Sequence, residues 1–141
     1  MMDKEDYLLR EVAKIGLLLR AIIGSLMHKK ENLSITLENQ FETTKELLLN
    51  EINFDLDKLL ALDEEATLDY VSQRIGINTG NLELLADLVF QLGINRQPAN
   101  SHIYFEKALQ LYEYCNKADR TFSMERQHKI NEIIMALDEK D

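Results

Sequence analysis

Apolar residues recur at helical spacing along almost the whole 141-residue chain, and this pattern limits most strongly what the chain can fold into. No stretch alternates apolar and polar residues with the two-residue period of a half-buried strand, and no Asn-Gly or Asp-Gly hairpin turn is present. The pattern predicts an all-α protein of about seven helices. Because no long linker or low-complexity segment interrupts it, we expect a single helical domain over residues 1–141.

The first helix is predicted to be long and apolar, over residues 3–29. Apolar side chains alternate there by three and four positions, as in helices that pack on other helices. Leu17 and Leu18 lie beside this line and widen the apolar arc. So wide an arc predicts a central helix with several neighbours, or a helix that gives one side to a second copy of the chain. The core line comprises Leu8, Val12, Ile15, Leu19, Ile22 and Leu26.

Capping residues and glycines mark the ends of the other predicted helices. Asp55, Thr67 and Ser123 stand where a helix needs an N-cap side chain. Gly76 and Gly93 are each followed by isoleucine, a pairing typical of a helix that stops on a left-handed glycine. These signals predict six further helices at residues 34–52, 56–62, 68–75, 79–92, 99–116 and 123–139.

Residues 79–117 contain a helical pair that resembles a tetratricopeptide repeat (TPR). The segment Tyr104-Phe105-Glu106-Lys107-Ala108-Leu109-Gln110-Leu111 is similar to the second helix of that repeat. The resemblance implies that Ala108 lets the paired helix approach closely and that Phe105 fills the space between the two helices. A peptide groove needs about three stacked repeats, and no second copy precedes this one. We therefore expect stacked helical hairpins with one TPR-like pair. Leu82, Leu85, Ala86, Val89 and Gly93 resemble the first helix and turn of the repeat.

The opening of the chain carries a second resemblance. The segment Asp6-Tyr7-Leu8-Leu9-Arg10 is similar to the start of a set of uncharacterised small bacterial all-helical proteins, which open with Asp-Tyr-aliphatic-aliphatic-Arg. The segment Arg120-Thr121-Phe122-Ser123, ahead of the last helix, resembles another part of the same set. The resemblance implies a helical fold and a bacterial cytoplasmic origin, and it implies no activity.

The net charge of −9 is concentrated in one part of the chain. Residues 31–70 hold eleven acidic and two basic side chains, whereas residues 1–30 carry a net charge of +2. An acidic protein lacks the surplus of cations that displaces phosphate counterions, so we expect no nucleic-acid partner. The acidic stretch is interpreted as a solvated face or as a surface for a basic partner, which includes the basic first helix of a second copy.

The sequence contains no motif for catalysis or for a cofactor, and we expect neither. His28, His102 and His128 fall on separate predicted helices, and no His-Glu-x-x-His motif is present. Cys115 is the sole cysteine, and an inert, partly buried thiol is its expected state. The alternative that stays open is a metal-dependent helical enzyme that uses the acidic region 31–70.

The most apolar run, residues 15–27, is shorter than the roughly 20 residues of a membrane span. Acidic residues near the start argue against a signal peptide, so we expect a cytoplasmic protein with no membrane partner. The function predicted from these features is non-enzymatic protein interaction or scaffolding. The predicted partner is another protein or a second copy of this chain. In the second case the two copies form a homodimer through the first helix. The residues predicted for the interaction surface are Tyr7, Arg10, Leu17, Leu18 and Tyr114.

Overall fold

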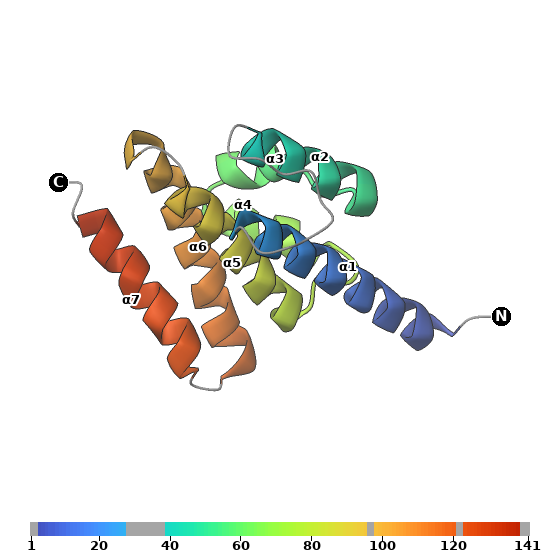
Figure 1. Cartoon of the computed structure of the whole chain (residues 1–141). Coiled ribbons are helices and arrows are strands. Elements are labelled where there is room, and N and C mark those ends of the chain that lie inside the picture. The colour runs from blue at the N-terminus through green and yellow to red at the C-terminus, as the bar shows by residue number, and fades with distance from the viewer. Residues whose placement is uncertain (1–2, 28–38, 96–97, 121–122, 139–141) are drawn as a thin grey trace.

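The all-α prediction is confirmed by the computed structural model, which describes residues 3–27, 39–95, 98–120 and 123–138. These residues form seven helices and no strand (Figure 1). The predicted start of the second helix at residue 34 lies outside the described residues. The helices are α1 (Lys4–Leu26), α2 (Gln40–Ile52), α3 (Leu56–Ala61), α4 (Glu64–Ser72), α5 (Thr79–Ile94), α6 (Pro98–Asp119) and α7 (Met124–Asp138).

Helix α5 occupies the centre of the fold. It packs most extensively against α6 and next most against α1, and α7 packs along α6 (Figure 1). Helices buried on several sides are apolar around their circumference rather than along one stripe. The buried residues of α5 follow this rule: Asn81, Leu82, Leu85, Ala86, Leu88, Val89, Leu92 and Gly93.

Helix α1 lies on the outside of α5 instead of at the centre. Its core line is buried from Ile15 to Leu26, but Leu8 on the same line is 47% exposed. The N-terminal turns of α1 extend beyond the other helices (Figure 1), so nothing in the described part of the chain covers them fully. The structure therefore does not confirm the interpretation of the wide apolar arc as a central helix with several neighbours. A side given to a second copy stays a prediction.

Side-chain caps set the starts of the short helices and of the last one. Asp55 and Ser123 cap α3 and α7 as predicted. Asp63, and not Thr67, caps α4, because its carboxylate accepts the backbone N–H of Ala66 at 2.8 Å. Thr67 lies one turn inside the helix, where it is buried and its hydroxyl donates to the Asp63 carbonyl at 2.7 Å. The prediction placed this helix start four residues too late.

Gly76 ends the turn after α4 with the predicted left-handed backbone, at φ 90°. A Cβ atom added there would lie 2.8 Å from Ile15 Cδ1 and 3.0 Å from Glu11 Cβ, so this glycine also lets the chain cross α1 closely. Gly93 plays a different part from the one predicted. Helix α5 continues through it to Ile94, and its missing side chain admits the ring of Phe105, which an added Cβ would approach to 2.8 Å.

We expect Gly76→Ala to lower the free energy of unfolding by about 1–3 kcal/mol, because alanine is strained at positive φ and its Cβ meets Glu11 and Ile15. Urea unfolding followed by circular dichroism measures the change. The matched control is Gly80→Ala, where an added Cβ meets only Asn78 Oδ1 at 3.6 Å. Its stability should stay the same or rise slightly. Equal losses in both variants would contradict the assignment.

Candidate functional site

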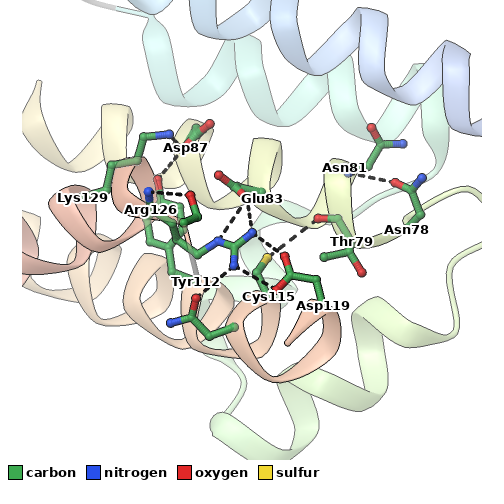
Figure 2. A network of polar contacts seen from close by, with 12 residues as sticks. Asn78, Thr79, Asn81, Glu83, Asp87, Tyr112, Cys115, Asp119, Arg126 and Lys129 are labelled. Carbon is green, nitrogen blue, oxygen red and sulfur yellow. Dashed lines mark hydrogen bonds and ion pairs between the residues drawn. The ribbon is translucent and has the colours of Figure 1, made fainter. Parts of the chain in front are cut away.

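The guanidinium of Arg126 is a buried charged group at the junction of α5, α6 and α7 (Figure 2). Its Nε and Nη2 donate to Glu83 Oε1 at 3.1 and 2.6 Å, and Nη2 also donates to Asp119 Oδ2 at 2.8 Å. Nη1 donates to Asn116 Oδ1 at 2.9 Å and to Asp119 Oδ1 at 3.4 Å. The hydrogen bonds that Arg126 donates to Asp119 and Glu83 raise its pKa in spite of its burial. All five N–H groups are used, so none is free for a ligand.

A second polar group lies one turn further along the same helices. The hydroxyl of fully buried Tyr112 donates to Asp87 Oδ1, and Lys129 Nζ donates to the same oxygen at 2.8 Å (Figure 2). Burial, with the nearby Asp87 charge, raises the pKa of Tyr112. A phenol held protonated and already donating to a carboxylate cannot serve as a general base near neutral pH. This group ties the three helices together in the same way as the Arg126 cluster.

The Cys115 thiol is fully buried beside the start of α5, with Sγ 3.8 Å from the Thr79 carbonyl oxygen (Figure 2). Burial raises its pKa to about 12. The thiolate is the nucleophilic form of cysteine, so the thiol is unreactive near neutral pH. The structure agrees with the predicted inert thiol.

Lys107 is a buried lysine that the sequence reasoning did not single out. Its Nζ donates to the Leu62 carbonyl at 2.8 Å, to Thr67 Oγ1 at 2.5 Å and to Gln110 Oε1 at 2.9 Å. Burial lowers its pKa. All three protons are used to hold the α3–α4 turn against α6. The signal that could have revealed it is its place on α6, one turn after buried Tyr104.

A polar cleft of about 440 Å³ lies between α1 and the α5–α7 side of the fold. Gly16 and Arg20 of α1, Asn81 of α5 and Glu125 of α7 are among its lining residues. Asn81 Nδ2 donates to the carbonyl of Val12 at 2.9 Å and to that of Gly76 at 2.7 Å. Because a Cβ at Gly16 would lie 3.1 Å from Asn81 Oδ1, the glycine is needed for this close contact. The Asn81 contacts therefore form part of the helix packing that builds the cleft wall.

The acidic side chains of α2 to α4 are dispersed rather than gathered at one point. Lys45 Nζ pairs with Asp57 at 2.5 Å, an interaction that raises the pKa of Lys45, while Asp55 and Asp63 cap helices. Within the described ranges, no three or more His, Cys, Asp or Glu side chains are grouped to hold a metal ion. Residues 31–38 of the predicted acidic region lie outside those ranges. No described contact favours the metal-dependent alternative.

Three of the predicted interaction residues are on the surface of α1. Tyr7 is 51% and Leu17 69% exposed, and Arg10 is also exposed. Tyr7 and Arg10 belong to the first two turns of α1, and Leu17 lies further along the same helix. These positions are accessible to a partner.

The other two predicted interaction residues are covered. Leu18 is half-buried and packs against the core. Tyr114 is buried at 8% exposure, and its hydroxyl donates to the Glu64 carbonyl of α4. The prediction of a surface contact at Tyr114 is wrong, because α4 covers the side of α6 that carries this residue. Burial is also the main reason that the pKa of Tyr114 is raised.

No protein-family model matches this sequence, and comparisons with curated proteins and with solved structures give no match either. The TPR-like pairing of α5 with α6 and the resemblance to small bacterial proteins stay predictions. None of the helices in the described ranges combines the length and the hydropathy that crossing a membrane requires. The function is therefore inferred from the chain's own side chains.

We expect Arg126→Met to lower the free energy of unfolding by about 2–4 kcal/mol, because it leaves the partly buried carboxylates of Glu83 and Asp119 without their cation. Urea unfolding at neutral pH measures the loss. Lys117→Met, at an exposed position of the same region, is the control and should change stability by less than about 0.5 kcal/mol. Similar losses in the two variants would show that the cluster does not hold α7 in place.

The Cys115 thiol should make stability fall at alkaline pH. Its pKa of about 12 lies above the ordinary pKa of 9.0 for a cysteine thiol, so the thiol ionises first in the unfolded chain. Between about pH 9 and pH 11 the wild type should lose about 1–2 kcal/mol more unfolding free energy than Cys115→Ala. Tyrosines titrate in both proteins and cancel from the difference. Parallel pH curves for the two proteins would contradict burial of the thiol.

Proposed function

We propose that this chain is a non-enzymatic protein-interaction module of the bacterial cytoplasm, and that it binds its protein partner through α1. The observation that carries the proposal is the outer side of α1, where Leu9 and Leu17 are 66% and 69% exposed. These two leucines are eight residues apart and so lie on the same side of the helix. Apolar side chains gathered on one side of a surface helix are typical of a binding face.

The N-terminal end of α1 carries a second exposed apolar surface, on a different side of the helix from Leu9 and Leu17. Leu8 and Tyr7 are about half exposed, and with Ile75, which is 61% exposed, they line a hollow of about 550 Å³. Removing apolar surface from water contributes about 25 cal/mol per Å². Covering these side chains with a partner would therefore stabilise the complex, and the fold would not need to change.

The polar groups that resemble catalytic residues support an interaction role as well. Arg126, Tyr112, Lys107 and Cys115 are all buried. The first three donate to partners within the fold, and the thiol is held protonated. Each of them is used to join helices, which leaves α1 as the most accessible functional surface.

The double variant Leu9→Glu/Leu17→Glu tests the proposal. Tagged full-length wild type and variant are incubated with extract of the source cells, and bound proteins, including untagged copies of the chain, are quantified by mass spectrometry. Losing the burial of two leucines should reduce recovery of the partner at least about tenfold. Circular dichroism checks that the variant is folded.

The matched control is Met135→Glu, which removes an apolar side chain that is 64% exposed on α7 instead of α1. It should recover the partner as well as the wild type does. Equal recovery by the wild type and by both variants would contradict binding through α1.

A further inference from the structure

The outer side of α1 carries a stripe whose spacing is palindromic. Its members are separated by three, four, four and three positions, so they lie along one side of the helix. All five are exposed. The apolar part reads the same from both ends, whereas the two ends carry opposite charges. The stripe comprises Asp6, Leu9, Ala13, Leu17 and Arg20.

A stripe of this kind is complementary to itself when two copies lie antiparallel. With the two Ala13 residues facing one another, Leu9 of each copy faces Leu17 of the other, and Asp6 faces Arg20. A parallel arrangement would instead bring Asp6 against Asp6 and Arg20 against Arg20. Like charges placed together oppose association, so the charges select the antiparallel arrangement. That arrangement is two-fold symmetric, as most homodimer interfaces are.

Both charged ends of the stripe are exposed, although Ala13 and Arg20 also line the polar cleft between α1 and the α5–α7 side. Among the described residues, neither Asp6 nor Arg20 forms an ion pair within its own chain. The centre of the stripe is Ala13, and small side chains at the crossing point let two helices approach closely. Both features favour a second α1 as the occupant of this face.

The charge of α1 argues against its docking on the acidic surface of another copy. Between Lys4 and Leu26 four basic side chains are offset by three acidic ones, so the helix is close to neutral. The positive balance of residues 1–30 comes largely from positions 29 and 30, which lie outside the described residues. The complementary charges are therefore the acidic and basic ends of α1 itself. The helix as a whole is not basic enough to favour docking on an acidic surface.

We propose that two copies of the chain associate through antiparallel pairing of their α1 helices about Ala13. This proposal rests on the proposed function and names its partner. Stable interfaces bury about 1,200–2,000 Å² in total, and one helix pair of a few turns buries less. The dimer is therefore weak, and the fraction of dimer rises with protein concentration.

The test is sedimentation equilibrium of the full chain from about 1 μM to about 1 mM, with charge reversals at the two ends of the stripe. Asp6→Arg and Arg20→Asp each place like charges together at both ends of the pair. Each variant alone should raise the dissociation constant at least about tenfold. An equal mixture of the two should restore association to within about threefold of the wild type, because the reversed charges then face one another.

Lys117→Asp reverses an exposed charge on α6 and should leave association unchanged. A wild type that stays monomeric overturns the pairing, as does a dimer that neither reversal weakens or that mixing fails to restore. If the wild type is monomeric and Leu9→Glu/Leu17→Glu still loses a captured protein, the interaction function stands and its partner is a different protein. Equal capture by all variants would instead contradict the interaction function itself.

Discussion

Burial of α5 between α1 and α6 is the constraint on which the rest of the structure depends. The helix is packed on both sides, and the close approach of α6 requires a glycine at position 93 to admit the Phe105 ring. Ala86 and Ala108 are fully buried within the same helical pair. The other elements attach to this pair, with α1 on one side and α7 on the other (Figure 1). Because α5 takes the central place, α1 keeps a side that faces solvent.

Three buried polar side chains fix how the outer elements sit on the α5–α6 pair. Asn81 holds α1 through the Val12 carbonyl, Arg126 holds α7 through Glu83, and Lys107 holds the α3–α4 turn. Displacing the partner of a buried polar group costs free energy, because the group is then left without a hydrogen bond. Each of these contacts therefore favours one register of packing. Arg126 and Lys107 use their N–H groups for these contacts within the fold, so neither has an N–H group left for a ligand.

Local signals predicted the fold well, and long-range packing explains the errors. Helical periodicity, the Asp55 cap and the left-handed Gly76 depend on a few neighbouring residues, and the structure confirms them. The buried state of Tyr114 depends on α4, which is distant in sequence and covers the side of α6 that carries this tyrosine. Gly93 was predicted to stop a helix, because nothing local distinguishes a stop from a crossing. The outer stripe of α1 was missed for the same reason, since its exposure depends on where the other helices end.

Hydrogen exchange measured by mass spectrometry at several protein concentrations tests the central claim most directly, namely that α5 is the core and α1 is the binding face. We expect amides of residues 85–92 to exchange slowest at every concentration. Amides of residues 5–17 should exchange fast in dilute protein and become protected as concentration rises. Protection of residues 5–17 that is independent of concentration, or exchange of residues 85–92 as fast as that of α1, would contradict it.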